Sequence, residues 1–273
     1  MKPFFKWSGG KSREISRILP YIPEFETYYE PFVGGGALWL HLEPSRAVIG
    51  DAYEEVINFF SVIKQNPGLI KKLNEIAVEY NEAVRGCKTK EEQQKVADVF
   101  YYKYRESAPS DPFNKAIRFY LLRQLSFSGM LRFGKNGKFN VPYGWYKSLK
   151  NINVDEHSIR RVFSNTTFKC SSWEETLTNS TKKDFVFLDP PYTRKFQKYH
   201  PDGDFGKKEH QNLAAWFSQK KSNALIIVNA DEFTRELYKS FIKEEYDKRY
   251  SIQYRDRMTE NDSNAIHLLA TNY

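Results

Sequence analysis

A short polar motif, Asp189-Pro190-Pro191-Tyr192, follows directly on the apolar run 185–188. Asp189 offers carboxylate oxygens, and the two prolines lack a backbone N–H, so the motif presents acceptors with few competing donors. Tyr192 adds a flat ring face against which a base can stack. The motif is complementary to a planar ring with an exocyclic amino group, which would place one hydrogen on Asp189 and the other on the carbonyl oxygen of Pro190.

These acceptors would also make such an amine reactive. An amino group conjugated with an aromatic ring is a poor nucleophile, because its lone pair is delocalised into the ring. Two acceptors that hold its hydrogens pull the nitrogen toward a pyramidal geometry and release that lone pair. We therefore predict that the catalytic residues are Asp189, Pro190, Pro191 and Tyr192. The alternative is a proline-rich strand end that only closes a turn.

A glycine-rich segment, Pro31-Phe32-Val33-Gly34-Gly35-Gly36, lies between a predicted strand at 27–30 and a predicted helix at 36–42. Glycines there let the backbone approach a ligand closely and open a helix N-terminus toward it. Asp51 ends the next predicted strand, where a carboxylate suits paired ribose hydroxyls. The pattern indicates a nucleotide-type cofactor. NAD is the less favoured alternative, because the spacing departs from G-x-G-x-x-G.

Alternating strands and helices must position these motifs. Short apolar runs predict buried strands of the parallel type at 27–30, 47–50, 167–170, 184–188 and 224–228. Helical patterns lie between them at 11–19, 36–42, 54–64, 208–219 and 231–241. This alternation predicts an α/β three-layer sandwich with a mostly parallel sheet. The segments 245–254 and 265–273 predict an antiparallel edge pair joined by a polar loop.

The stretch 56–150 interrupts the alternation, so we predict a catalytic domain of residues 1–55 and 151–273 that carries it as an insertion. Helical patterns at 69–85, 91–104 and 113–125 precede Asn136-Gly137, which predicts a β-hairpin. The end of the insertion is basic and should neutralise phosphates, through Arg118, Arg123, Arg132, Lys135, Lys138, Lys147 and Lys150. A solvated basic loop is the alternative.

Composition agrees with a polyanionic, base-bearing partner. The 273 residues carry 42 basic and 34 acidic side chains, a net charge of +8, and 16% aromatic residues. A basic protein with an aromatic core would show the same numbers. No apolar run is long enough to span a membrane, and we expect no secretory signal, because the first residues contain no apolar stretch. Two distant cysteines, Cys87 and Cys170, fit the reducing cytoplasm, where we expect the protein.

Several other chemistries are excluded by the residues present. Gly10-Lys11-Ser12 is no P-loop, because Phe5 stands where that motif needs a glycine. The five histidines are scattered without metal-ligand spacing, so no metal site is predicted. The chain has no Pro-Cys pair, so a cytosine-C5 mechanism would lack its thiol nucleophile.

Taken together, the motifs resemble those of the Dam-type (D12 class) DNA adenine-N6 methyltransferases. Besides Asp189–Tyr192, the resemblance rests on Phe5-Lys6-Trp7-Ser8-Gly9-Gly10-Lys11, on Glu30-Pro31-Phe32-Val33-Gly34-Gly35-Gly36, and on 127–142 continuing into Tyr143-Gly144-Trp145-Tyr146-Lys147, all in the family's order. It implies a Rossmann-like fold and S-adenosylmethionine as cofactor, with direct in-line transfer of the methyl group. It implies cofactor contacts by Trp7, Gly10, Lys11, Pro31, Phe32, Gly34, Gly36, Asp51, Ser172 and Asp189.

The resemblance also implies how DNA is bound. Phe127 takes the position of the aromatic residue that fills the gap left by a flipped adenine, and Arg132 that of an arginine suited to guanine O6 and N7. The other DNA contacts implied are Lys6, Ser128, Met130, Lys138 and Pro142. The chain has Phe127-Ser128-Gly129-Met130 where the family commonly has Tyr-Asn-Gly-Leu. Because Lys6, Arg132 and Pro142 match the readers of GATC, we expect that site.

Two other function classes stay open. One is a methyltransferase for RNA or a protein amine, although protein-amide enzymes favour Asn at the position of Asp189. The other is a DNA-binding homologue without catalysis, which the intact 189–192 and 34–36 motifs disfavour. The expected partner is double-stranded DNA, and the expected state is a monomer without metal or membrane. Whether a cognate restriction endonuclease accompanies it is left open by the sequence.

Overall fold

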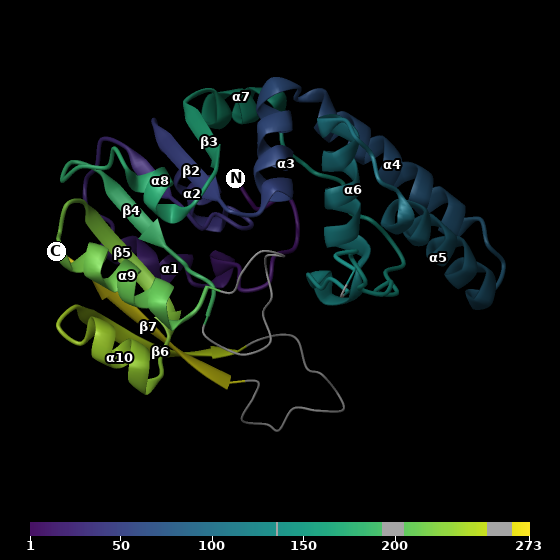
Figure 1. Cartoon of the computed structure of the whole chain (residues 1–273). Coiled ribbons are helices and arrows are strands. Elements are labelled where there is room, and N and C mark those ends of the chain that lie inside the picture. Colours follow the sequence, from purple (N-terminus) through teal and green to yellow (C-terminus); the bar gives the residue numbers. More distant parts are fainter. Residues whose placement is uncertain (135, 193–204, 250–263) are drawn as a thin grey trace.

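The computed structural model describes residues 1–134, 136–192, 205–249 and 264–273 (Figure 1). Lys135 and the polar loop predicted between the last two strands lie outside the described residues. Within the described parts, no helix is long and apolar enough to cross a membrane.

A mixed sheet forms the centre of the part predicted to be catalytic (residues 1–55 and 151–273, called the catalytic part below), with strand order β3-β2-β1-β4-β5-β7-β6. The strands are β1 (Tyr28–Glu30), β2 (Ala47–Asp51), β3 (Thr166–Cys170), β4 (Phe185–Leu188), β5 (Asn223–Asn229), β6 (Ile242–Arg249) and β7 (Asn264–Thr271). Strands β1 to β5 pair in parallel, whereas β7 runs antiparallel to β5 and β6. The predicted sheet and its antiparallel edge pair are therefore confirmed.

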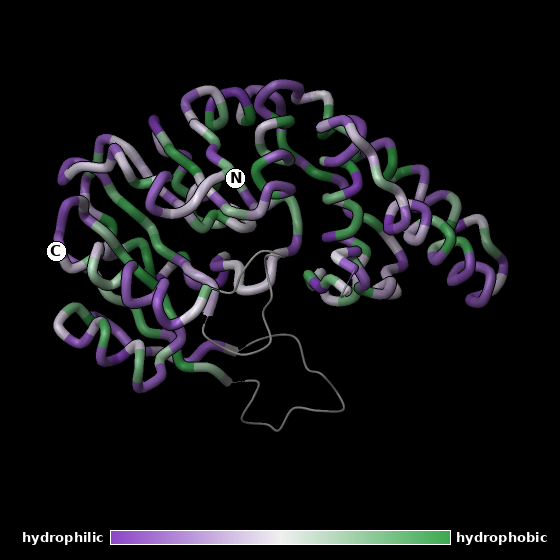
Figure 2. Tube along the Cα trace, in the orientation of Figure 1, coloured by the Kyte–Doolittle hydropathy of each residue, from purple (hydrophilic) through white to green (hydrophobic). Residues whose placement is uncertain are grey.

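Helices cover both faces of this sheet, because successive strand residues alternate between two buried clusters. Phe185 and Phe187 face one cluster, which includes residues of α1 (Ile15–Ile18), α2 (Ala37–Leu42), α3 (Glu54–Gln65) and α7 (Glu156–Ser164). Val186 and Leu188 face the other, with α8 (Trp173–Leu177), α9 (Lys207–Ser218) and α10 (Glu232–Tyr238). The three-layer sandwich is thus confirmed, and its strands form the continuous apolar stretches of Figure 2.

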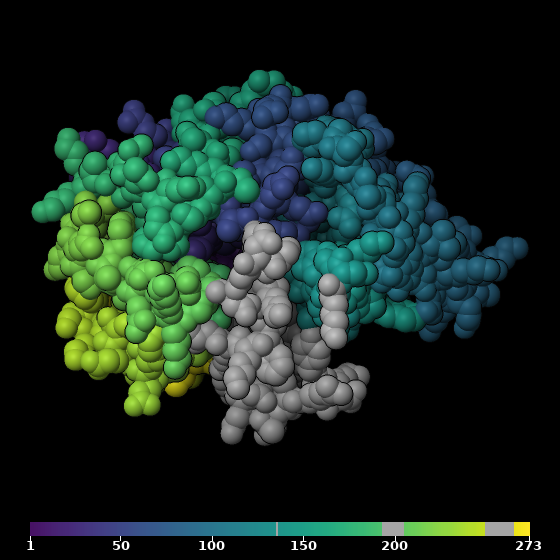
Figure 3. Space-filling view, in the orientation of Figure 1, coloured from purple at the N-terminus to yellow at the C-terminus, as the bar shows by residue number. Residues whose placement is uncertain are grey.

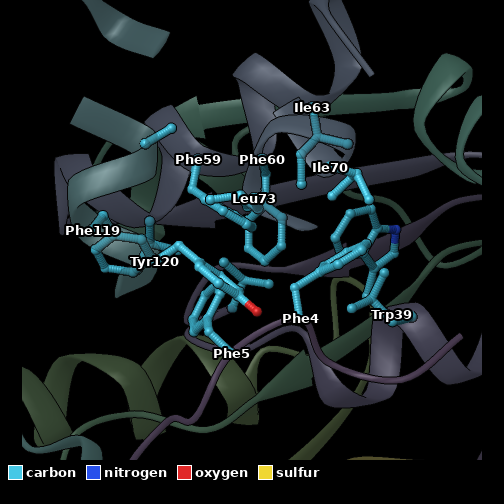
Figure 4. Close-up of a cluster of buried hydrophobic side chains, with 14 of the residues drawn as sticks. Phe4, Phe5, Trp39, Phe59, Phe60, Ile63, Ile70, Leu73, Phe119 and Tyr120 are labelled. Atoms are coloured by element: carbon cyan, nitrogen blue, oxygen red, sulfur yellow. The ribbon is translucent and has the colours of Figure 1, made fainter. Parts of the chain in front are cut away.

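The insertion consists of long helices that extend away from the sheet (Figure 1). They are α4 (Gly68–Arg85), α5 (Lys90–Glu106) and α6 (Pro112–Leu125). One aromatic-rich core joins this part to the catalytic part: Phe4 and Trp39 pack with Phe59 and Phe60 of α3, and Phe59 packs with Phe119 of α6 (Figure 4). On the face shown in Figure 3, the residues of α3 to α6 adjoin the catalytic part directly.

Local structure differs from the predictions in three places. The predicted helix at 11–19 is broken into η1 (Lys11–Arg13), α1 and η2 (Leu19–Tyr21), and Pro20 lies in the last of these. Helices α7 and α8 were not predicted, although Asp155 and Ser172 cap them in the usual way, by accepting from the amide three residues on. The predicted hairpin is held by isolated antiparallel bridges, Ser126 with Tyr143 and Phe133 with Phe139, rather than by continuous strands.

Candidate active site

The two predicted motifs meet at the carboxyl edge of the sheet. β1 pairs in parallel with β4, so the glycine turn after Glu30 and the motif at Asp189 leave the sheet side by side. β2 flanks β1 on the other side and ends at Asp51. From β1 the chain continues to β2 on one side of the sheet, and from β4 it continues to β5 on the other side. Ligands of open α/β sheets bind at such a topological switch point. The topology therefore places both predicted sites in one location.

Lys11 connects the N-terminal segment to the catalytic motif. Its Nζ lies 2.6 Å from both carboxylate oxygens of Asp189, and it donates to Gly9 O and Tyr192 OH at 2.9 Å. The Lys11 side chain is 3% exposed and that of Asp189 is 19% exposed. The ammonium that was predicted to hold the cofactor thus has the carboxylate of Asp189, predicted to be catalytic, as its partner in this structure.

Burial raises the pKa of Asp189, and the charge and hydrogen bond of Lys11 oppose that rise. Without Lys11, a carboxylate in this location would favour its protonated form still more. A protonated Asp189 would offer the incoming amine one acceptor oxygen fewer. Lys11 therefore favours the ionised, acceptor-only form of Asp189.

The backbone of the catalytic motif is held from behind by α9. His210 Nε2 lies 3.0 Å from the carbonyl oxygen of Pro191, and since a carbonyl can only accept, Nε2 must carry the proton. Burial lowers the pKa of His210, which keeps the ring neutral. No sequence pattern predicted this contact, because α9 follows the motif only after residues 193–204.

A buried polar cluster lies behind Tyr192. The ring of His267 packs edge-on against Tyr192, with centroids 5.4 Å apart, and its Nδ1 lies 2.8 Å from Glu14 Oε2. Tyr246 and Lys248 also donate to the Glu14 carboxylate. Burial alone would raise the pKa of Glu14, but these hydrogen bonds and the charge of Lys11 lower it to about 2. The cluster fixes the wall against which Tyr192 packs.

Asp51 fixes the glycine turn. Its Oδ2 accepts from Gly34 N and its Oδ1 from Tyr53 N, both at 2.9 Å. Gly34 and Gly36 have φ values of 45° and 65°, in the left-handed region that favours glycine. The Trp7 indole lies on Gly34 and Gly35, since a Cβ added at Gly34 would come within 2.2 Å of Trp7 Nε1. The glycine turn therefore contacts both the Trp7 indole and the Asp51 carboxylate.

A buried carboxyl group supports the turn from the end of β1. Glu30 Oε2 accepts from Tyr28 OH at 2.8 Å and from Trp39 N, in α2, at 3.3 Å. Burial raises the pKa of Glu30 to about 8, so the group is largely protonated at neutral pH. Glu30 therefore contributes hydrogen bonds that orient α2 below the glycine turn.

The remaining predicted cofactor residues lie around this location. Gly10 N donates to Trp7 O at 3.2 Å, which closes a turn below the indole. Pro31 is buried, and Phe32 packs edge-on against Phe205, with centroids 5.4 Å apart. Ser172 caps α8 beyond β3, whose last residue is in register with Asp51. Of these residues, Ser172 lies on the side of β2 and β3, whereas Phe32 packs on the side of α9.

Replacing Gly34 with Ala should weaken cofactor binding at least about tenfold, because the new Cβ meets the Trp7 indole and the backbone is strained by roughly 1–2 kcal/mol. Titration calorimetry with sinefungin, a non-reacting analogue of S-adenosylmethionine, would measure it. Gly137→Ala is the matched control, since Gly137 has φ of 72° and open space around it. Equal affinities of the two variants would contradict the packing argument.

The predicted DNA-reading segment exposes several of its side chains to solvent. Arg132 Nε donates to Asn140 Oδ1 at 2.8 Å and its second guanidinium nitrogen donates to Asn140 O at 3.0 Å, so the guanidinium bridges the two arms. Phe127, at the start of the segment, is 40% exposed, which is unusual for a large apolar side chain. Ser128 follows at φ of 53° and Met130 is partly buried, whereas Lys138 and Pro142 are exposed.

Lys6 lies where the N-terminal segment meets this DNA-reading segment. Its Nζ donates to Gln124 O at 2.9 Å and lies 3.4 Å from the centre of the Tyr146 ring. Partial burial of the ammonium, together with the positive charges of Lys150 and Arg123, lowers the pKa of Lys6 to about 8. Lys6 is thus placed beside the predicted readers, with a charge that is lost at moderately alkaline pH.

Two of the predicted phosphate-binding arginines make contacts within the protein instead. Arg123 is only 1% exposed, so the expectation that it neutralises a phosphate is wrong. Arg118 pairs with Glu55 at 3.3 Å. The charge pattern of the sequence could not distinguish these arginines from Arg132, because helix α6 buries one of its faces against α3. In the described parts of the chain, no cluster of three or more His, Cys, Asp or Glu residues could hold a metal ion.

The sheet order, the glycine turn after β1, the acid after β2 and the acceptor motif after β4 define the Rossmann-like fold of S-adenosylmethionine-dependent methyltransferases. The chain belongs to the D12 class of N6 adenine-specific DNA methyltransferases, whose family profile matches residues 7–253.

Curated relatives agree with this assignment. The chain is 34% identical to Type II methyltransferase M.CviBI of Paramecium bursaria Chlorella virus NC1A, over 100% of both chains. It is 30% identical to Type II methyltransferase M1.LlaDCHI of Lactococcus lactis subsp. cremoris, over 88% of this chain and 86% of that one. It is also 30% identical to a DNA adenine methylase of Salmonella typhi, over 87% and 84%. A solved rRNA methyltransferase from Streptomyces viridochromogenes reaches a TM-score of only 0.37 at 11% identity, covering 96% of this chain and 83% of that one.

Proposed function

We propose that this chain is a site-specific methyltransferase that flips a target adenine out of duplex DNA and transfers the methyl group of S-adenosylmethionine to its exocyclic amine. The observation that carries the proposal is the position of Asp189, which Lys11 holds at 2.6 Å beside the glycine turn that Trp7 covers. The acceptor motif and the cofactor turn therefore share one rim. The residues fit the cofactor, because Asp51 suits ribose hydroxyls and the glycines admit close backbone approach.

When bound, S-adenosylmethionine supplies the methyl group on a sulfonium, which needs no metal for its activation. The chain's own residues then orient the nucleophile: Asp189 and the carbonyl oxygen of Pro190 accept the two amine hydrogens, and Tyr192 offers its ring to the adenine. His210 fixes the backbone at Pro191. The methylated amine becomes acidic as the new bond forms, so it loses its proton without a strong general base.

Flipping of the base follows from the geometry of the substrate. The adenine amino group inside a duplex is paired and stacked, and cannot reach a motif at the carboxyl edge of a buried sheet. We propose that Phe127 fills the gap that the adenine leaves, which its exposure at the start of the DNA-reading segment supports. Residues 56–150 then act as the target-recognition part.

The proposed recognition sequence is GATC, supported by the match of Lys6, Arg132 and Pro142 to the readers of that site. Arg132 and Pro142 are exposed on the same segment, and Lys6 contacts Gln124 and Tyr146, which flank that segment in the chain. Ser128, Met130 and Lys138 complete the proposed DNA contacts. Two relatives have names of Type II methyltransferases, so a cognate restriction endonuclease is a proposed partner. We further propose that the enzyme acts as a monomer in the cytoplasm.

Arg132→Ala should relax specificity at one base pair and cost on the order of 1–3 kcal/mol there, because two guanidinium donors to guanine are lost. The measurement is kcat/KM on duplexes that differ at single positions of the mapped site. Lys138→Ala is the control. Lys138 is exposed, and the removal of a lysine that contacts a phosphate should lower kcat/KM equally on all duplexes. Equal losses on every duplex for Arg132→Ala would show that Arg132, too, contacts only phosphate.

DNA affinity should fall as the pH rises through about 8, because the pKa of Lys6 is lowered to that value in the free protein. Below this pH Lys6 is already charged, whereas above it DNA binding requires proton uptake. The loss should approach about tenfold per pH unit. Fluorescence anisotropy from pH 7 to 9.5 would measure it. In Lys6→Arg the charge persists, so the slope should vanish, and an unchanged slope would assign the dependence to another group.

A transfer assay with S-adenosylmethionine labelled in its methyl group tests the function class. Double-stranded DNA should accept the label, and RNA and protein should not. Label in RNA or protein would favour the alternative substrate classes, whereas DNA binding without label in any substrate would indicate a homologue that has lost catalysis.

A further inference from the structure

A buried arginine lies between the cofactor side and the DNA side of the site. Arg123, on α6, donates from one terminal guanidinium nitrogen to Met130 O at 2.9 Å, and its Nε points to Lys6 O at 3.4 Å. Its guanidinium carbon lies 5.2 Å from the centre of the Trp7 indole. Neither the proposed chemistry nor phosphate binding uses this side chain, which is 1% exposed.

Trp7 and Met130, which Arg123 contacts, belong to the two different proposed binding sites. Trp7 lies on the glycine turn at Gly34 and Gly35. Met130 lies in the DNA-reading segment, next to Gly129, where a Cβ would come within 2.9 Å of Lys6 Cβ and 3.1 Å of Arg123 O. The glycine turn, the indole, the guanidinium and the reading turn therefore form one series of direct contacts.

The chemistry of a buried guanidinium makes this series stiff. Arginine keeps its charge at any ordinary pH, and its donors form a planar fork of fixed geometry. Withdrawing a hydrogen-bond acceptor from a buried charge is costly, so Met130 O and the indole cannot shift independently of the side chain. Displacement of Trp7 by a ligand thus acts on the backbone at Met130.

We propose that Arg123 is a positioning residue that couples cofactor binding to the conformation of the DNA-reading turn, so that each ligand raises the affinity for the other. The proposal rests on the proposed function, because it takes the glycine turn as the cofactor site and residues 127–142 as the DNA site. Thermodynamic linkage requires that the cofactor raises the affinity for DNA by the same factor by which DNA raises the affinity for the cofactor.

Hydrogen exchange on the wild-type protein gives the first test, without DNA. Sinefungin should slow amide exchange in residues 127–134, which it does not contact, and should leave the distant helix α4 unchanged. In Arg123→Met, which keeps an unbranched side chain but loses the charge and donors, the protection at 127–134 should disappear. Protection that persists in Arg123→Met, or that is absent from the wild type, would overturn the proposal.

Binding gives the second test. The affinity for a short duplex carrying a mapped methylation site should rise about tenfold on adding sinefungin to the wild type, and less than about twofold in Arg123→Met. Arg118→Met is the matched control on the same helix, because Arg118 contacts Glu55 and Arg105 rather than either site. It should keep the wild-type coupling. Equal coupling in Arg123→Met and Arg118→Met would contradict the assignment.

Two further readouts keep the outcomes distinct. If Arg123→Met does not fold by thermal melting, Arg123→Lys replaces it, since a lysine keeps the charge but cannot maintain the fork; wild-type coupling in Arg123→Lys would then refute the proposal. Calorimetry with sinefungin alone and anisotropy with DNA alone report on the proposed function separately. If the wild-type protein bound either sinefungin alone or DNA alone with no measurable affinity, that result would refute the proposed function rather than the coupling.

Discussion

Asp189→Asn is expected to reduce kcat by roughly 10²- to 10³-fold, because the amide replaces one carboxylate acceptor with a donor and removes the charge that polarises the target amine. Asn has nearly the shape of Asp, so the motif should keep its backbone contact with His210. DNA affinity should change little, since Asp189 lies at the sheet edge rather than on the reading segment. Single-turnover methylation and anisotropy would separate these two effects.

Lys138→Asn is the matched control for this experiment. It introduces the same amide on the exposed reading segment, where it should weaken DNA binding without lowering the single-turnover rate at saturating DNA. If Asp189→Asn instead methylated at near the wild-type rate, Asp189 would have no role in activating the amine. If it lost DNA affinity in proportion to rate, its role would be in binding.

Lys11→Met should destabilise the fold by about 3 kcal/mol, because it leaves the Asp189 carboxylate without its charged partner. We take the lower end of the range for a broken buried pair, since Asp189 retains 19% exposure. The pKa of Asp189 is already raised and should rise further, so its folded pKa lies above its unfolded one. The deficit should therefore be largest above that folded pKa and shrink as the pH falls through it.

Urea denaturation at pH 5 and pH 8 would measure this dependence. The double variant Lys11→Met/Asp189→Asn should recover most of the loss and all of its pH dependence, because neither charge remains. Lys64→Met is the control. Lys64 donates to the neutral carbonyl of Thr166 at 2.7 Å, so the stability lost in Lys64→Met should not depend on pH in this range. A pH-independent deficit in Lys11→Met would mean that Asp189 is not the partner that matters.

The sheet and its motifs could be predicted from the sequence because their signals are local. The run 185–188 is apolar at every position and is followed by Asp189, so both the strand and the motif at its end were readable. The glycine turn and Asp51 were found for the same reason. The helix at 11–19 was mispredicted because its periodic pattern did not reveal the break at Glu14, whose side chain turns into the buried cluster.

The supports of the site could not be predicted, because their partners lie far apart in the chain. Glu14 meets His267 across 253 residues, and neither residue has a neighbouring pattern that announces the pair. Arg123 looked like a surface cation in a basic stretch, whereas the packing of α6 buries it. Asn136-Gly137 correctly indicated a reversal, with Gly137 at φ of 72°, but the number of paired residues depends on contacts beyond the turn.

The most direct test is to treat unmethylated duplex DNA with the enzyme and S-adenosylmethionine, and then to map modified bases by sequencing and identify them by nucleoside analysis. We predict N6-methyladenine at one short sequence, with GATC as the proposed site, and its disappearance with Asp189→Asn. N6-methyladenine at a different sequence would replace the proposed site and leave the chemistry intact. Modified cytosine, or DNA that stays unmodified while RNA or protein accepts the methyl group, would contradict the account.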